Sequence, residues 1–366
     1  MKFKSSFSVL VISGVLLSAA SSAYADISYA LRPLTLPSGT IQTGGMAVND
    51  QGTALTFGLD SSSAIQALVY SNPKQSQLLT PPAGSSSQVV GYGINGLGQV
   101  VGTTGDSAGS HATLWSTPNA PGVSLGGGGS AAIGINDTGL VVGQITTADG
   151  RSRAAIFTTT GPIDIGGSSP AESAAYAVSN SGYVVGLIMS DNGYEAAWFD
   201  FPHSNVVTLG GLGGANSAAE AVNDWGLAAG FADLASGDTQ ATIFNLATGT
   251  AQGLGTLGGQ MSYAYGINNL GQVVGLAETA TGAEHYFLWD AQHGMQDLQS
   301  LIDPSSGWQI SGVSDINNVG QIMATACRDG QCQAALLNPL SAVPEPSTWA
   351  FMVAGLGWVV ARRRRC

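Results

Sequence analysis

Residues 92–102 read YGINGLGQVVG, and residues 265–275 read YGINNLGQVVG. Related phrases occur seven times along the chain, each with an Asn, or in one case a Ser, at a position that we call the anchor. The anchors are Asn49, Asn95, Asn136, Ser179, Asn223, Asn268 and Asn317. Their mean spacing, (317 − 49)/6 or about 45 residues, is typical of a repeat protein in which each unit buries its apolar face against its neighbours.

The sixth repeat illustrates the parts of one unit. A strand at 263–267 leads into the turn 268–271, whose Asn and Gly residues tolerate a left-handed backbone. The β-branched residues at 272–276 predict a second strand, residues 285–290 a third, and residues 295–298 a weaker fourth. Four short strands per repeat of this length indicate a β-propeller blade.

The ends of the repeat region predict how a ring closes. Residues 27–39 look like a lone fourth strand, whereas the last repeat ends after its third strand at 333–338. An N-terminal strand would complete the last blade and remove its exposed edge. We therefore predict an all-β fold, a seven-bladed β-propeller over residues 26–342. A parallel β-solenoid and two separate sandwiches are the rival interpretations.

The residues just before the anchor have a second pattern. One residue before it stands Val or Ile, and two residues before it stands Ala or Gly, with Asp315 as the exception. Period-2 alternation places these two positions on opposite faces of the strand. Small side chains permit the close approach that the innermost strand of a propeller requires.

The N-terminal segment has the three parts of a secretory signal peptide. Lys2 and Lys4 precede an apolar run at 6–17, and the small residues that follow end at Ala25. This order predicts a signal peptide over residues 1–25 that is cleaved between Ala25 and Asp26. A buried or transmembrane helix is the alternative, but the run is short and has the wrong flanks.

The C-terminal segment, residues 343–366, begins VPEP and ends in four arginines, Arg362, Arg363, Arg364 and Arg365. Between them, residues 349–361 are apolar, which at about 1.5 Å per residue covers roughly 20 Å of a hydrocarbon core of about 30 Å. We expect a short transmembrane segment, with the arginines held on the cytoplasmic side.

Pro344, Glu345 and Pro346, the apolar segment and the arginine cluster together resemble the PEP-CTERM sorting signal of Gram-negative bacteria. The resemblance implies processing near these three residues by an exosortase-type membrane protease. Export, transient anchoring in the inner membrane and release to the cell surface or the medium would follow. The short apolar segment and Cys366 depart from the pattern.

The net charge of the region between the two terminal segments, which we call the body, excludes some classes of partner. Between Asp26 and Val343 there are 5 basic and 22 acidic residues, a net charge of 5 − 22 = −17. Nucleic acid is excluded as a partner, because phosphate binding relies on Lys and Arg. We expect contact with the membrane only through the C-terminal tail before processing.

Cys327 and Cys332 bracket an Asp-Gly turn, as the two strands of a hairpin would. In an oxidising compartment they predict a disulfide. Metal binding is the alternative, and it would require further ligands that the sequence does not supply.

The repeats also resemble a bacterial family of extracellular HAF repeats, in which GIN-x-x-G-x-VVG precedes an H-A-F-x-W segment. HATLW at 111–115 and HYFLW at 285–289 come nearest to the second segment. The resemblance implies a secreted repeat protein and no particular reaction. We expect no catalytic residues, no metal and no cofactor, since nucleophile-elbow and phosphate-loop motifs are missing from the sequence.

Hydroxyl residues stand six positions before most anchors and are candidates for binding a sugar. They are Thr43, Ser130, Ser173, Ser217, Ser262 and Ser311. We expect them near one mouth of the channel, unless each bonds its own loop. Three tryptophans of the third strands, Trp115, Trp198 and Trp289, could stack on sugar rings, although their regular placement favours the core.

These observations predict an exported, exosortase-sorted cell-surface or matrix protein without enzymatic activity, which binds exopolysaccharide or surface proteins. The association of PEP-CTERM tails with exopolysaccharide production supports this interpretation. The alternative is a polysaccharide hydrolase or lyase that uses carboxylates at the channel mouth. Glu172, Glu220 and Asp315 are the candidates, provided that two of them converge.

Overall fold

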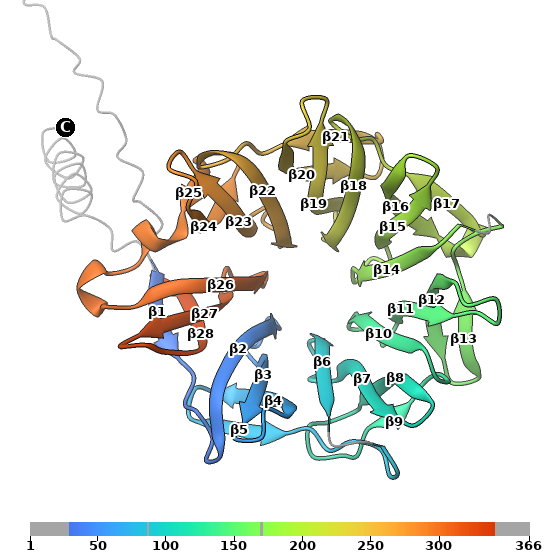
Figure 1. Ribbon diagram of the computed structural model, residues 1–366, viewed down its shortest axis with the longest axis horizontal. Coiled ribbons are helices and arrows are strands. Elements are labelled where there is room, and N and C mark those ends of the chain that lie inside the picture. The colour runs from blue at the N-terminus through green and yellow to red at the C-terminus, as the bar shows by residue number, and fades with distance from the viewer. Residues whose placement is uncertain (1–28, 86–87, 169–170, 341–366) are drawn as a thin grey trace, which may run out of the picture. The chain divides into compact units, whose positions relative to one another are not determined.

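The computed structural model describes residues 29–85, 88–168 and 171–340. Seven antiparallel, four-stranded sheets form a ring around a central channel (Figure 1). The predicted seven-bladed β-propeller is therefore confirmed. The predicted signal peptide and sorting tail lie outside the described residues.

The blades are numbered along the chain, and in each the first strand lies nearest the channel (Figure 1). Blades 1 to 3 are β2 (Thr40–Val48), β3 (Ala54–Asp60), β4 (Ile65–Asn72) and β5 (Gln75–Leu78); β6 (Val89–Ile94), β7 (Val100–Asp106), β8 (Gly109–Trp115) and β9 (Val123–Ser124); and β10 (Ser130–Ile135), β11 (Val141–Thr146), β12 (Ser152–Thr158) and β13 (Gly161–Asp164). Blades 4 and 5 are β14 (Ser173–Val178), β15 (Val184–Ser190), β16 (Gly193–Asp200) and β17 (Asn205–Thr208); and β18 (Gly213–Val222), β19 (Leu227–Leu234), β20 (Thr239–Asn245) and β21 (Thr250–Gly253). Blades 6 and 7 are β22 (Gly258–Ile267), β23 (Val273–Thr279), β24 (Glu284–Asp290) and β25 (Gly294–Asp297); and β26 (Gln309–Ile316), β27 (Ile322–Arg328), β28 (Gln331–Pro339) and β1 (Tyr29–Pro33).

The ring closes through blade 7, as the sequence predicts. The N-terminal strand β1 pairs antiparallel with β28, and Leu31 lies opposite Leu337. Tyr29 and Leu34 are buried at this junction, and the backbone N–H of Leu34 donates to the carbonyl of Ala334 over 2.9 Å. Because the two ends of the described chain share one sheet, blade 7 has four strands like the other six blades, and the ring is closed.

The third residue of the Val-Val-Gly motif is glycine for a steric reason. A Cβ on Gly143 would lie 2.0 Å from the carbonyl oxygen of Ala131, on the first strand of the same blade. A Cβ on Gly275 would lie 1.9 Å from the carbonyl oxygen of Tyr263 in the same way. Any side chain at this position would push the two innermost strands apart.

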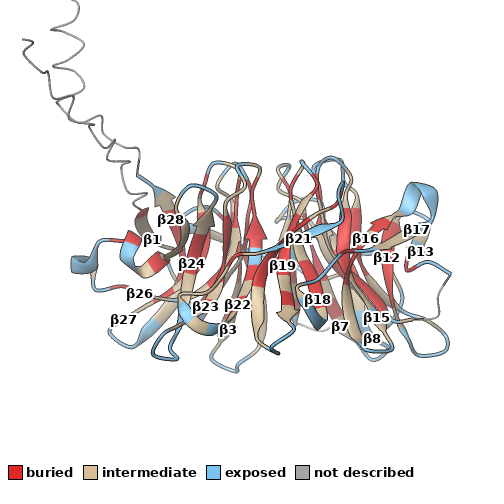
Figure 2. Cartoon of the chain, turned by 90° about the horizontal axis from the view of Figure 1, so that it is seen from above, coloured by how far each residue is buried: buried red, intermediate tan, exposed pale blue. Residues whose placement is uncertain are grey.

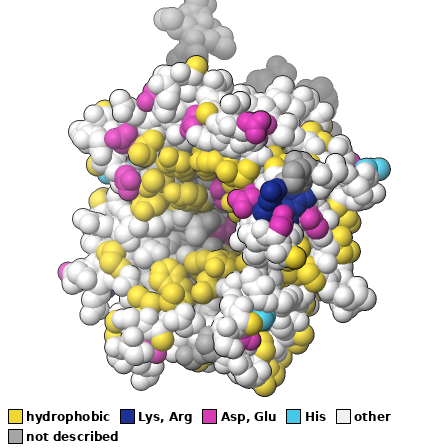
Figure 3. Space-filling model, turned by 45° about the vertical axis from the view of Figure 1, so that its right-hand side comes forward, with side chains coloured by type: hydrophobic (Ala, Val, Ile, Leu, Met, Phe, Trp, Pro, Cys, Tyr) yellow, Lys and Arg dark blue, Asp and Glu magenta, His cyan; other side chains and the backbone are white. Residues whose placement is uncertain are grey.

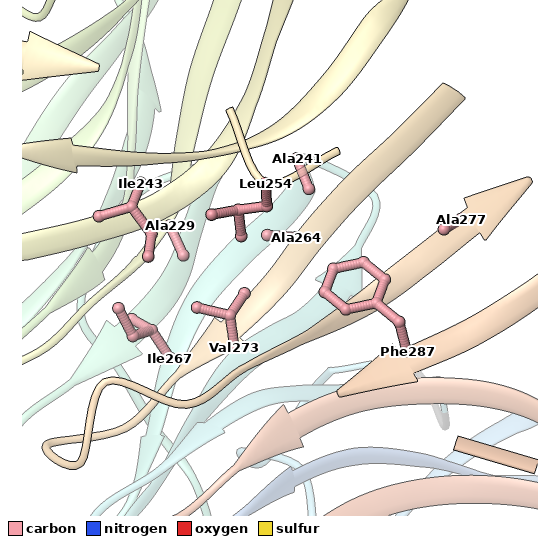
Figure 4. Packing of buried hydrophobic residues seen from close by; sticks show 9 residues of the cluster. All are labelled: Ala229, Ala241, Ile243, Leu254, Ala264, Ile267, Val273, Ala277 and Phe287. Carbon is pink, nitrogen blue, oxygen red and sulfur yellow. The ribbon is translucent and has the colours of Figure 1, made fainter. Parts of the chain in front are cut away.

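The hydrophobic core lies between neighbouring blades. At the contact of blades 5 and 6, Ile243 and Leu254 from blade 5 meet Val273 and Phe287 from blade 6 (Figure 4). Buried residues run through the blades, while exposed residues gather at the loops (Figure 2). Full burial of a side chain such as Phe or Val contributes roughly 1.5–3 kcal/mol, and this packing recurs around the ring.

The helical segments in the described residues are three short 3-10 turns, Phe201–His203, Leu298–Leu301 and Pro304–Ser306. Within this part of the chain, none is long and apolar enough to cross a membrane. The short transmembrane segment that we predict at 349–361 lies outside the described residues.

Candidate binding sites in the central channel

The anchor residues form a belt of hydrogen bonds that links the blades. The side-chain amide of each anchor Asn donates to the backbone carbonyl of the next anchor over 2.8–3.1 Å. Among these described turns the belt is interrupted between Ser179 and Asn223, because serine has no amide to donate. Each anchor oxygen also accepts from its own turn: Asn95 Oδ1 accepts from the N–H groups of Leu97 and Gln99. The anchors therefore serve the fold.

The residue after each anchor forms a second belt at one mouth of the channel. In six of the seven described turns, its side-chain oxygen accepts the backbone N–H of the equivalent residue in the preceding blade, over 2.6–2.9 Å. The seventh residue, Gly96, has no side chain, so this belt is open between Asp50 and Gly96. The residues are Asp50, Gly96, Asp137, Asn180, Asp224, Asn269 and Asn318. They line a cavity of about 200 Å³. A carboxylate oxygen has more than one acceptor site, so this mouth keeps capacity for further hydrogen bonds.

Trp225 stands beside this belt and faces solvent. It follows Asp224 in the turn of blade 5, and its side chain is 74% exposed. The indole N–H donates to the carbonyl oxygen of Asn269 in blade 6 over 3.0 Å, which holds the ring in place. Leu97 and Leu270 occupy the same turn position in other blades and are also exposed. The mouth therefore combines one indole ring held by a hydrogen bond, and other exposed apolar side chains, with carboxylates and amides.

A ring of Val and Ile side chains lies where this mouth adjoins a second cavity in the channel. These residues precede the anchors by one position. Five of them, Ile94, Ile135, Val178, Val222 and Ile267, line both cavities. The second cavity has a volume of about 360 Å³, within the range of roughly 300–1,000 Å³ usual for small-ligand pockets.

A β-bulge in each first strand supplies the side chains of the second cavity. In all seven blades the pairing of the first and second strands shifts three residues before the anchor. Such bulges re-aim a side chain, and all seven bulged residues line the cavity. They are Met46, Tyr92, Ile133, Tyr176, Glu220, Tyr265 and Ser314. Figure 3 shows a hollow at the centre of the ring, flanked by hydrophobic side chains with acidic ones at its margin.

Glu220 is the carboxylate among these bulged residues. Its neighbours in the ring are Tyr176 on β14 and Tyr265 on β22. Burial raises the pKa of Glu220 from its ordinary value of 4.5 to about 7. Burial, and to a smaller extent the charge of Glu220, raise the pKa of Tyr176 to about 12. A carboxyl group that titrates near neutrality in a cavity is a candidate for binding or for proton transfer.

The other two candidate carboxylates are placed differently. Asp315 lines the same cavity as Glu220, but its oxygens accept the backbone N–H groups of Val48, over 2.9 Å, and Ile316, over 2.8 Å. Burial raises the pKa of Asp315 to about 6, against these two hydrogen bonds, which lower it. Glu172 precedes β14, is exposed, and is not among the residues that line this cavity. Two of the three candidates, Glu220 and Asp315, therefore share one cavity.

The candidate hydroxyl residues mostly lie between blades. Ser130, Ser173, Ser217 and Ser262 are buried, and each accepts a backbone N–H from the third strand of the preceding blade over 2.9–3.0 Å. Thr43 does the same with Ala334. The prediction that they sit near a channel mouth does not fit these residues, because their hydroxyls satisfy backbone groups in the core. Ser311 is exposed, and its hydroxyl lies 3.4 Å from the carbonyl oxygen of Thr325.

The third-strand tryptophans belong to the core. Trp115 is fully buried, and its indole N–H donates to the carbonyl oxygen of Thr80 over 2.7 Å. Trp198 and Trp289 are partly buried and pack against core clusters. Their regular positions therefore reflect packing between blades.

The predicted disulfide is present. Cys327 on β27 lies opposite Cys332 on β28, and the two are bonded across the hairpin with Cα atoms 4.0 Å apart. In the described part of the chain, His, Cys, Asp and Glu side chains form no group of three or more that could hold a metal ion.

No family model matches the chain, and no curated protein matches it. Among solved structures, it is similar to a puromycin-hydrolyzing peptidase of Mycobacterium tuberculosis, with a TM-score of 0.55 and 13% identity, over 85% of this chain and 57% of the peptidase. The chain thus spans less than two thirds of that protein. It is also similar to the lectin BP39L from Burkholderia pseudomallei, with a TM-score of 0.48 and 11% identity, over 83% of this chain and 99% of the lectin. A Trypanosoma rangeli sialidase matches with a TM-score of 0.40 and 10% identity, over 86% of this chain and 58% of the sialidase. Identities this low show the propeller fold alone.

Among the candidate ligand-binding residues, sequence reasoning identified Glu220 and Asp315 in the second cavity, but it missed the tyrosines of that cavity and Trp225 beside the mouth. Tyr176 and Tyr265 stand three positions before their anchors, and Trp225 stands two positions after. Aligning the seven repeats on their anchors would have displayed these two columns. Their exposure toward the channel depends on the bulge and on the turn, which the alignment alone does not reveal.

Proposed function

We propose that this protein is an exported, exosortase-sorted cell-surface or matrix protein that binds extracellular polysaccharide without cleaving it. The main support for the proposal is the position of Trp225. A hydrogen bond from its indole N–H to the backbone of Asn269 holds the ring beside a mouth that is lined with carboxylates and amides. An indole face packs against the C–H face of a sugar ring, while carboxylates and amides accept and donate hydrogen bonds to hydroxyl groups.

The negative charge of the repeat region limits the classes of polysaccharide that the protein could bind. At −17 between Asp26 and Val343, the body repels an acidic polysaccharide, so the proposed ligand is neutral or carries amines. Export and processing follow from the predicted signal peptide and from the resemblance of Pro344, Glu345 and Pro346 to a sorting signal. A surface protein of the same cell is the other partner class that we expect.

The test is to incubate the purified protein with the exopolysaccharide of the organism that makes it. Both co-sedimentation and polymer length are measured, for the wild type and for Trp225→Ala. Leu97→Ala is the matched control, because Leu97 occupies the same turn position in blade 2 and is also exposed. Retention at unchanged length that falls about 10-fold in Trp225→Ala alone supports the proposal. Absence of retention would point to a protein partner instead.

One observation favours a second candidate, a polysaccharide hydrolase or lyase. Glu220 and Asp315 line one cavity, and burial raises the pKa of Glu220 to about 7, which suits a general acid near neutral pH. Shortening of the polymer in the same experiment, abolished by Glu220→Gln, would replace the binding proposal with this one.

A further inference from the structure

The second cavity places one carboxylate between aromatic rings. Glu220 comes from blade 5, and the bulged residues of the two adjacent blades are Tyr176 and Tyr265. Burial raises the pKa of each tyrosine to about 12, and the charge of Glu220 adds a smaller contribution, which at Tyr265 comes after those of Tyr286, Glu284 and Tyr263. Tyr92 lines the same cavity from blade 2 and is 37% exposed, as is Tyr265.

Glu220 has no basic residue of this chain beside it in the cavity. Among the described residues that line the cavity there is no Lys, Arg or His. Two arginines elsewhere in the described chain make other contacts. Arg153 binds Asp164 over 3.0 Å, and Arg328 lies 4.4 Å from the ring centre of Trp308. The negative charge of Glu220 is therefore balanced by solvent or by a bound ligand.

We propose that this cavity binds an organic ammonium group, such as the protonated amine of an amino-sugar polymer. A carboxylate attracts the positive charge, and aromatic faces stabilise ammonium groups through cation–π contacts that strengthen when water is excluded. An anion is excluded by Glu220 and Asp315, which face the same space. A metal ion would require more carboxylate or imidazole ligands than the cavity offers.

This inference rests on the proposed function, in that it names the class of polysaccharide. The residues to be substituted at the two sites nevertheless differ. Trp225 stands at the Asn and Asp mouth, whereas Glu220 lies beyond the ring of Val and Ile side chains that lines both cavities. Each site can therefore be substituted separately in a binding experiment.

The test is isothermal titration calorimetry of the purified protein with a glucosamine oligomer, which has free amines, and with its N-acetylated counterpart of equal length. We expect the free-amine oligomer to bind at least about 10-fold more tightly than the acetylated one. Choline, a quaternary ammonium ion whose charge does not change with pH, is the small probe of the cavity itself. Glu220→Gln should weaken binding of the amine and of choline by about 10-fold or more.

Glu172→Gln is the matched control, since Glu172 is an exposed carboxylate outside the cavity, and it should leave both affinities unchanged. Thermal unfolding of Glu220→Gln at pH 8 verifies that the variant is folded. Equal affinity for the free and acetylated oligomers, or an unchanged affinity in Glu220→Gln, would overturn the inference. Binding of choline and free amines that survives in Trp225→Ala, while the native polymer is not retained even by the wild type, would reject the proposed function and keep the ammonium site.

Discussion

The stability of the protein should depend on pH through Glu220, and the size of the effect follows from its environment. Burial raises the pKa of Glu220 from 4.5 to about 7 in the folded protein. In this pH window the folded state binds more protons than the unfolded state, so the free energy of unfolding falls as pH rises. At roughly 1.4 kcal/mol per pKa unit, the full shift corresponds to about 3 kcal/mol.

The perturbation is Glu220→Gln, which keeps the shape of the side chain and removes its charge. At pH 4, where both side chains are neutral, the difference in unfolding free energy between wild type and variant is a baseline. Between pH 4 and pH 8 the wild type should lose about 3 kcal/mol relative to the variant. The contribution of Asp315 has the same direction, but it cancels because both proteins contain it.

The assay is urea unfolding, followed by tryptophan fluorescence, at pH values from 4 to 8. Because the comparison is between two proteins at each pH, other titrating groups are subtracted. Glu172→Gln, which removes an exposed carboxylate outside the cavity, is measured in parallel as the control for loss of one acidic side chain. Parallel curves for wild type and Glu220→Gln would show that Glu220 is solvated like a surface carboxylate, and would refute this account of the cavity.

Three further predictions concern the belts and the hairpin. Ser179→Asn should supply the missing donor to the carbonyl of Asn223 and raise the unfolding free energy by about 1 kcal/mol, measured by urea unfolding; a decrease would mean that the turn of blade 4 does not accommodate the amide. Asn95→Ala should cost roughly 2–4 kcal/mol in the same assay, because it leaves buried backbone groups without partners; a loss below 1 kcal/mol would contradict this role of the belt. Reduction of the Cys327–Cys332 disulfide should lower stability by about 2 kcal/mol, as loop closure of so few residues predicts, and the thermal midpoint should fall with dithiothreitol in the wild type but not in a Cys332→Ser variant.

The repeat period was enough to predict the fold, because each repeat carries its own turn and strand signals. The Asn-to-Gly turn, the Val-Val-Gly strand and the aromatic third strand are local patterns. Such patterns can be recognised within one repeat, without information about the neighbouring blades. The closure by β1 was also predictable, since a ring requires a fourth strand that the last repeat lacks. Ser179, read from the sequence as a variant anchor, is the point where the anchor belt is interrupted.

The direction of the candidate hydroxyl side chains could not be predicted from the repeat pattern. Their regular spacing was real, but regular spacing marks equivalent positions without saying which way a side chain faces. Ser130 and Ser262 point between blades and accept hydrogen bonds from a neighbouring sheet. A partner in another blade is a tertiary contact, so the repeat of a single blade does not reveal it.

The sequence by itself determined the seven repeats, their four strands, the N-terminal closure and the acidic charge of the body. Only the tertiary structure decided which side chains meet in the channel. The bulge before each anchor arises from pairing with the second strand, and it aims Tyr176, Glu220 and Tyr265 at a common space. The pKa of Glu220 likewise depends on burial by adjacent blades. Turn and strand propensities act within a few residues, whereas burial and electrostatics sum over all atoms nearby in space, and these come from segments about 45 residues apart in the chain.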